Sequence, residues 1–320
     1  MKQWLLSLLL WRVAPTCHNS RDALFSAYNN DAEVLAVIET HIPASVKDVL
    51  GWSSRDTILD ALGAPRLLQW TELFCGTGTL SKHLGRVLPR GRSIDTQVGD
   101  SSHDILTPVG YAHVLRTIIS LAPWAFCWLA PPCSLWVFLS AGVHKRSLLR
   151  PSGDTTRADI RASNLIAHRC CVICRILTLR LVQWIIEQPV TSCFFRFSSF
   201  VKLRDSKRKI LRFGLQRKFL WLGHWGGNLK KPTALWGISP ALDRLHSKRP
   251  KSMPAMSVKK TTLKTIFKDG RWQVVHRIYG VRKVLRNSQV YPERFCKELA
   301  GHVALIYKRS LSSFKSPIWS

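Results

Sequence analysis

The chain has 320 residues, and 46% of them are hydrophobic. It is therefore long and apolar enough to bury a core, which excludes an intrinsically disordered protein. Its 48 lysines and arginines against 19 acidic residues give a formal net charge of +29. About 28 of the basic residues but only about 5 of the acidic ones follow position 200. Such a basic half attracts polyanions, most often nucleic acid; an acidic protein, a membrane surface or a solvated face without a partner are the alternatives.

The N-terminal part is predicted to be helical. Residues 1–15 place a lysine before a short apolar run, Trp4 to Trp11, which fits a signal-peptide core or an amphipathic docking helix. Residues 20–64 have a helical pattern that ends at Gly63. No uninterrupted apolar run approaches the ~18 residues of a membrane-spanning helix, so we expect no stable membrane insertion.

The cysteines indicate reduced thiols. There are nine of them, an odd number without regular spacing, which is unlike a secreted disulfide framework. We therefore expect an intracellular protein, with the nucleus as one location. His168, Cys170, Cys171 and Cys174 cluster in HRCCVIC, but no second pair at zinc spacing accompanies them. We interpret these cysteines as core residues of a helix and predict no metal.

Three short apolar segments predict buried parallel strands: residues 66–74, 123–130 and 181–187. Helical patterns lie between them, and this alternation predicts a doubly wound α/β sheet. The segments end in FCGTG, PPCS and EQP. Ligands bind at the carboxyl ends of strands in such sheets, so we expect the three ends to share one site. Cys133 lies in the second end, where a nucleophile, a small buried hydrophobe and a metal ligand are the possible roles.

The first strand end is a glycine turn that leads into a helix. Gly76 and Gly78 let the backbone approach a ligand closely, and the helix start offers free N–H groups. Asp95 follows Glu72 at the distance expected for the end of a second strand, RSID, where a carboxylate binds ribose hydroxyls. Asp104, in HDIL, is a second acidic candidate. A structural tight turn and surface or capping carboxylates are the alternatives.

The rest of the chain is strongly basic. Residues 191–230 look irregular, 230–240 fit a short strand, and 244–268 fit a basic loop or linker. The last element, YPERFCKELAGHVALIY, is predicted to be a helix entered through Pro292. These patterns suggest three parts: a helical extension over 1–64, an α/β domain over 65–240, and a basic linker with a C-terminal helix that packs back over 241–320.

At this point the motifs resemble a known family. ELFCGTG, HDI, APPCS and IIEQP occur in the order of the motifs of the cytosine-5 DNA methyltransferase family, and YPERFCKELA is similar to its closing helix. The resemblance covers residues 66–190 well and 288–305 weakly. It implies a Rossmann-like methyltransferase sheet, S-adenosyl-L-methionine as cofactor, and methyl transfer to carbon 5 of cytosine in DNA or RNA, with the target base flipped out of a duplex.

The resemblance also implies roles for individual residues. Cys133 corresponds to the nucleophile, and Glu187 to the carboxyl group that supports the cytosine ring. The implied cofactor contacts are Phe74, Gly76 and Gly78, with Asp95 on the ribose and Asp104 with Ile105 on the adenine.

The chain departs from the family pattern at several positions. Ser134 replaces the usual Gln, Gln188 the usual Asn and Glu72 the usual Asp, and no Gln-x-Arg-x-Arg motif is present. About 35 residues, 241–275, stand where the family has a long target-recognition region. The alternative is therefore a catalytically degenerate protein with this fold that binds nucleic acid through its basic half. A methyltransferase acting on amino groups or on another substrate is a third reading.

Overall fold

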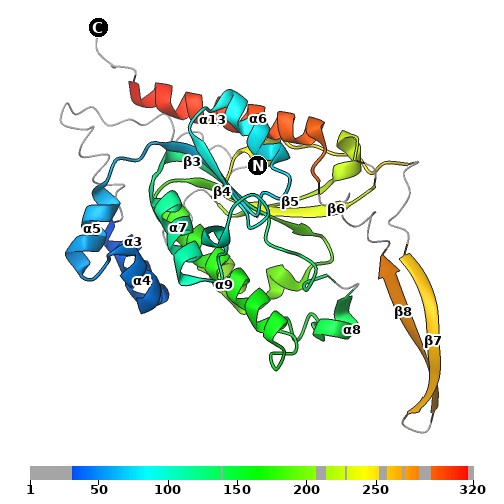
Figure 1. Ribbon diagram of the computed structural model, residues 1–320. Helices are drawn as coiled ribbons and strands as arrows, with labels where there is room; N and C mark the ends of the chain where they lie inside the picture. The colour runs from blue at the N-terminus through cyan, green and yellow to red at the C-terminus, as the bar shows by residue number, and fades with distance from the viewer. Residues whose placement is uncertain are drawn as a thin grey trace.

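The computed structural model describes residues 31–137, 140–206, 214–227, 229–251, 258–268, 271–280 and 290–315. It is an α/β structure built on a six-stranded sheet with the order β2-β1-β3-β4-β6-β5 (Figure 1). The strands are β1 (Leu68–Leu73), β2 (Gly91–Ile94), β3 (Leu121–Leu129), β4 (Gln183–Pro189), β5 (Gln216–Trp221) and β6 (Pro232–Gly237). The strands predicted from the three apolar segments, from RSID and from residues 230–240 are thereby confirmed.

The first four strands along the chain are parallel, and their carboxyl ends lie in register. Leu73 pairs with Ile94 on one side and with Leu129 on the other, and Leu129 pairs with Ile186. β6 runs antiparallel to both β4 and β5, so the sheet is mixed. The neighbours of β1 are β2 on one side and β3 on the other. The topological switch point, where ligands bind in open α/β sheets, therefore lies between β1 and β3.

Helices cover both faces of the sheet (Figure 1). On one face, α6 (Thr79–Val87) packs beside the C-terminal helix α13 (Glu293–Lys315), which also contacts β3. A contact between His83 and Glu293 joins these two helices. On the other face lie α7 (Pro108–Ile119) and α9 (Ala158–Leu179). The C-terminal helix thus packs against α6 and β3, although more than 50 residues of chain separate it from β6.

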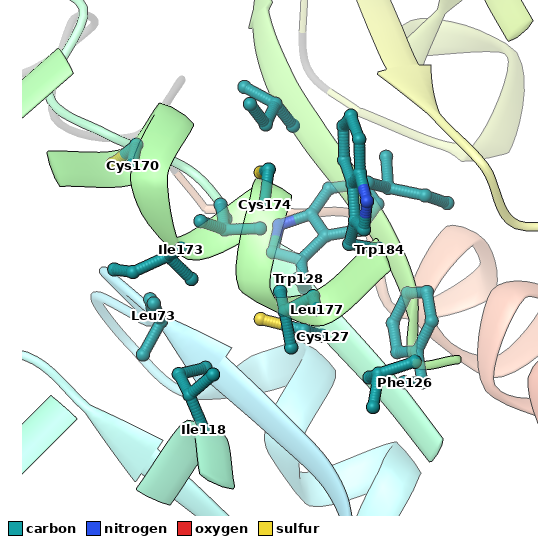
Figure 2. Close-up of a cluster of buried hydrophobic side chains, with 14 of the residues drawn as sticks. Leu73, Ile118, Phe126, Cys127, Trp128, Cys170, Ile173, Cys174, Leu177 and Trp184 are labelled. Atoms are coloured by element: carbon teal, nitrogen blue, oxygen red, sulfur yellow. The ribbon is translucent and has the colours of Figure 1, made fainter. Parts of the chain in front are cut away.

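The main core lies between the sheet and α9 (Figure 2). Trp184, on β4, is completely buried there, and Thr178 accepts a hydrogen bond from the Trp184 indole at 2.8 Å. The same cluster contains Cys170 and Cys174, so these cysteines are core residues. Burial raises the pKa of both thiols well above its ordinary value, which keeps them protonated.

α9 is also the helix that bears on the prediction of no stable membrane insertion. It is the one described helix long and apolar enough to cross a membrane, but 67% of its apolar window is buried inside the protein. A helix that is apolar all round and packed in this way is a core helix.

Within the described ranges, no group of three or more His, Cys, Asp or Glu side chains is placed to hold a metal ion.

The N-terminal extension consists, in its described part, of the helices α3 (Asp31–His41), α4 (Ala44–Leu50) and α5 (Arg55–Gly63). Arg180, at the end of α9, anchors them. Its guanidinium pairs with Asp31 at 3.2 Å and donates to the carbonyl of Leu62 at 3.2 Å. A buried cation needs such partners, so this contact fixes the extension to the domain. The apolar run Trp4 to Trp11 lies outside the described residues.

Two basic regions contain more structure than their sequences indicate. Residues 191–230, predicted to be irregular, contain α10 (Ser198–Asp205) and β5. Residues 244–268, predicted to be a loop or linker, contain the whole of β7 (Val258–Lys268), which pairs with β8 (Arg271–Gly280) in a separate two-stranded sheet. The prediction was wrong because a dense run of lysines was interpreted as a solvated loop, although valine, threonine and isoleucine between them favour strands.

The remaining elements are short. They are η1 (Ser101–His103), α8 (Ala141–His144), η3 (Cys193–Arg196), η5 (Leu222–Trp225) and α11 (Ala241–Arg244).

Candidate active site at the carboxyl edge of the sheet

The glycine turn after β1 has the backbone that its sequence predicts. Phe74, Gly76 and Gly78 all adopt positive φ angles, of 62°, 54° and 67°. Gly78 is also the N-cap of α6. A Cβ atom added at either glycine would meet nothing within 4 Å, so the space in front of this turn is open. The turn therefore exposes backbone and a helix N-terminus at the switch point of the sheet.

Asp95 stands beside this turn, at the end of β2. One of its carboxylate oxygens accepts a hydrogen bond from the Gly76 N–H at 2.9 Å, and the other accepts from the Gln97 N–H at 2.7 Å. The structure thus brings together Asp95 and the glycine turn, as the sequence predicts. In the free protein, the Asp95 carboxylate shapes the turn.

Asp104 and Ile105 have a different environment. The Asp104 side chain accepts a hydrogen bond from the Leu106 N–H at 2.9 Å, which shapes the entry to α7. Ile105 is buried, and its carbonyl accepts a hydrogen bond from Arg169. This segment is connected to the glycine turn indirectly, through His103. The His103 ring accepts a long hydrogen bond, of 3.4 Å, from the N–H of Asp95, which itself bonds to the turn. No direct bond joins Asp104 to the turn among the described residues.

Glu72 is a completely buried carboxyl group on β1. One oxygen accepts hydrogen bonds from the Ser81 N–H and hydroxyl, in the first turn of α6, and the Ser81 hydroxyl also accepts from Ser93. The other oxygen, Oε1, is buried and has no hydrogen-bond partner. Burial raises the pKa of Glu72 to about 7, although the hydrogen bonds from Ser81 oppose this rise. The site therefore holds a carboxyl group that titrates near neutral pH.

Cys133 is set apart from the other cysteines. Of the eight that the structure describes, it alone is not buried. Its carbonyl accepts hydrogen bonds from the N–H groups of Trp136 and Val137, which closes a turn directly after it. Gln188 holds the other side of this loop, because its amide donates to the carbonyl of Pro131. A rigid loop therefore holds a half-buried cysteine at the end of β3.

Arg146 supports the chain that follows Cys133. Its guanidinium lies 3.6 Å from the Trp136 ring centroid and donates hydrogen bonds to the Leu135 carbonyl at 2.7 Å and to Asn164 at 2.8 Å. Burial lowers the pKa of Arg146 to about 10, so it keeps its charge at neutral pH. A cation stacked on an aromatic ring and bonded to backbone carbonyls fixes the loop in one conformation.

Glu187, at the end of β4, is held in a buried polar cluster. Tyr291 donates a hydrogen bond to its Oε2 at 3.3 Å and accepts one from the Trp128 indole at 3.2 Å. Oε1 has no hydrogen-bond partner, and the nearest cation is the Lys231 ammonium at 3.8 Å. A buried oxygen of this kind is able to accept a further hydrogen bond from a ligand.

The charges of this cluster act on the thiol. Burial raises the pKa of Cys133, the negative charge of Glu187 raises it further, and the positive charge of Lys231 lowers it. Glu187 and Lys231 are thus close enough to influence Cys133 electrostatically. In the free protein the thiol is mainly protonated, because the two largest effects favour the neutral form.

Two residues of the site were not predicted from the sequence. Lys231 has a φ angle of 32°, which is unusual for a lysine and places strain next to the site. The only sequence signal was its position in KKPTALWG, near the place where an arginine motif was expected and not found. Tyr291 was included in the C-terminal helix motif, but nothing in that pattern indicates a bond to Glu187, 104 positions away.

Comparison with family models, with curated proteins and with solved structures finds no match for this chain. The site is therefore interpreted from its own geometry, together with the motif resemblance.

Proposed function

We propose that the protein transfers a methyl group from S-adenosyl-L-methionine to carbon 5 of cytosine in nucleic acid, with Cys133 as the nucleophile. The observation that carries the proposal is the position of Cys133, which is the one described cysteine that is not fully buried. It lies on a rigid loop at the end of β3, adjacent to the switch point of the sheet, with Glu187 at the next strand end.

The residues on the other side of the switch point suit the cofactor. The open space in front of Gly76 and Gly78 leaves room for a ligand against the backbone, and the unpaired Oε1 of Glu72 offers a buried acceptor. Gly76, Gly78 and Phe74 would hold the cofactor, with Asp95 at its ribose and Asp104 and Ile105 at its adenine. When bound, S-adenosyl-L-methionine supplies an electrophilic methyl group.

The residues around Cys133 supply the rest of the chemistry. Carbon 5 of cytosine is a poor nucleophile, and addition of the Cys133 thiolate to carbon 6 converts the ring into an enamine that is reactive at carbon 5. Glu187 faces the ring edge and stabilises the adduct through a proton or hydrogen bond at nitrogen 3. After methylation, loss of the carbon 5 proton expels the thiolate and restores the ring. Lys231 assists because its charge favours the thiolate.

The decisive experiment is a covalent trap. An oligonucleotide that contains 5-fluorocytosine cannot lose a proton from carbon 5, so the adduct with Cys133 persists and is detected as a band of raised mass on a denaturing gel. We expect such a band with DNA or RNA in the presence of the cofactor, and none with Cys133→Ser. Cys193→Ser is the matched control, because Cys193 is a buried cysteine outside the strand ends. A trapped band that persists in Cys133→Ser contradicts the assignment.

The second candidate function is nucleic-acid binding without catalysis. The raised pKa of Cys133 favours it, because a protonated thiol is a weak nucleophile. It predicts salt-dependent binding of nucleic acid, no binding of S-adenosyl-L-methionine in a calorimetric titration, and no trapped adduct.

A further inference from the structure

One face of β5, the outermost strand of the main sheet, presents aromatic and basic side chains. β5 lies at the end of the strand order and pairs with β6. Alternate residues of a strand share a face, so Arg217, Phe219 and Trp221 project from the same side. This face continues onto β6, because Trp236 is the direct partner of Arg217.

The rings and the guanidinium groups of this face are in contact with each other. The guanidinium carbon of Arg217 lies 3.9 Å from the centroid of the Phe219 ring and 5.4 Å from that of the Trp236 ring. At the other end of β5, the guanidinium carbon of Arg249 lies 5.3 Å from the centroid of the Trp221 ring. Cations are attracted to the faces of aromatic rings, so these contacts hold the side chains in place. We call these five residues the β5 platform.

The β5 platform is exposed, and its positive charge is not neutralised. Phe219 keeps 49% of its surface exposed, and Arg217 and Arg249 are exposed as well. Within the described part of the chain, no carboxylate forms an ion pair with either arginine. Asp243 bonds instead to Gln216, on the opposite face of β5. An exposed ring beside two such cations suits a ligand that is both anionic and aromatic.

The β5 platform is connected to the candidate active site at its Trp221 end. Trp221 pairs with Pro232, which directly follows Lys231. The N–H of Leu222 also donates a hydrogen bond to the Lys231 carbonyl at 3.2 Å. The Lys231 ammonium in turn lies 3.8 Å from the Glu187 carboxylate. A chain molecule bound along β5 is therefore led toward the site.

The chemistry of the β5 platform favours a single strand of nucleic acid. Such a strand combines phosphate charges with base faces that are free to stack on aromatic rings and guanidinium planes. In a duplex, the base faces stack on each other, and an acidic protein complements the arginines but not the exposed ring. We propose that the β5 platform binds single-stranded nucleic acid, with a base stacked on the Arg217–Phe219 pair and a phosphate at Arg249. This inference rests on the proposed nucleic-acid substrate and narrows it to a single strand.

The test is a titration, by fluorescence anisotropy, of a labelled single strand and of the duplex that contains it. Phe219→Ala should weaken binding of the single strand by about tenfold, because it removes one stacking contact, and should leave duplex binding within about twofold. Phe219→Tyr keeps the ring and should bind the single strand as the wild type does. Val109→Ala, at another exposed apolar position, is the matched control and should leave both affinities unchanged.

A second pair of variants tests the charge of the same face. Arg217→Gln should lower the slope of log K against log salt for the single strand by about 0.7, the effect of one phosphate contact. Lys218→Gln, on the opposite face of β5, is its control and should leave the slope unchanged. A loss in Arg217→Gln without a loss in Phe219→Ala would overturn the proposal, because it indicates an acidic protein or a duplex backbone as the partner. Equal losses for single strand and duplex in Phe219→Ala would overturn it too. Circular dichroism and thermal melting confirm that each variant is folded.

The covalent trap separates this proposal from the proposed chemistry. If the wild type forms no trapped adduct but Phe219→Ala selectively weakens single-strand binding, the β5 platform is supported and the methyltransferase is contradicted. If the adduct forms and Phe219→Ala binds the single strand as tightly as the wild type, the β5 platform is contradicted and the methyltransferase is supported.

Discussion

The carboxyl edge of the main sheet and the β7–β8 ribbon are built in opposite ways. At the sheet edge, two buried carboxyl groups, Glu72 and Glu187, are each held by neighbouring hydroxyl groups, and each keeps one buried oxygen without a hydrogen-bond partner. The ribbon has no carboxyl group in either strand, and it pairs mainly with itself. A site for chemistry needs groups that a packed framework fixes in place. The sheet edge has such a framework, whereas β7 and β8 form a separate two-stranded sheet.

The largest expected contrast is in stability, between a buried and an exposed position. Trp128 is completely buried at the sheet edge and contacts Tyr291 and Phe295 on the C-terminal segment. Trp128→Ala should lower the free energy of unfolding by about 3 to 5 kcal/mol, because it leaves a large cavity. Leu149→Ala, at a fully exposed position, should lower it by less than about 1 kcal/mol, because no packed contact is lost. Urea denaturation followed by circular dichroism measures both values, and similar losses would remove the contrast.

Glu72 should give the sheet edge a pH dependence that the ribbon lacks. Its pKa is raised from 4.5 to about 7, so the folded protein binds this proton more tightly than the unfolded chain does. Its contribution to stability is therefore complete below pH 4.5 and decreases as the pH rises toward 7. Glu72→Gln should remove this decrease and stabilise the protein at pH 8 by up to about 3 kcal/mol relative to wild type. Glu39→Gln, at an exposed position, is the control and should change nothing.

A smaller effect is expected from Tyr291. Its hydroxyl connects Glu187 with Trp128, so Tyr291→Phe removes one hydrogen bond from each partner. We expect a loss of about 1 to 2 kcal/mol in the free energy of unfolding, measured by thermal or urea denaturation. Tyr307→Phe, within α13, is the comparison. If both variants lose equally, the loss at Tyr291 does not come from its bonds to Glu187 and Trp128.

The most specific effect concerns the thiol. Because Glu187 raises the pKa of Cys133 and Lys231 lowers it, Glu187→Gln should lower that pKa and Lys231→Gln should raise it. The pH profile of alkylation by iodoacetamide measures the pKa in the free protein, with Cys133→Ser as the background. Methyl transfer should decrease in both variants, although their thiol pKa values move in opposite directions. Shifts in the same direction would show that the two charges do not act on Cys133 directly.

Much of the candidate site was predictable, because its parts lie at strand ends. The positions of Gly76, Cys133 and Glu187 followed from three apolar segments, each with an unusual residue group after it, and parallel strands bring such ends together. Lys231 and Tyr291 were not predictable in the same way. Lys231 precedes an antiparallel strand whose direction the sequence pattern does not reveal. Tyr291 reaches Glu187 only because the C-terminal helix packs back on β3.

The sequence by itself determined the alternation of strands and helices, the glycine turn, the rigid Pro-Cys loop and the concentration of basic residues after position 200. These features depend on local periodicity, backbone preferences and composition, which are readable one segment at a time. Only the tertiary structure decided which of eight described cysteines is not fully buried, which carboxyl oxygens lack hydrogen-bond partners, and which strands pair in each sheet. Those properties depend on burial and strand register, which arise from contacts between residues far apart in the chain.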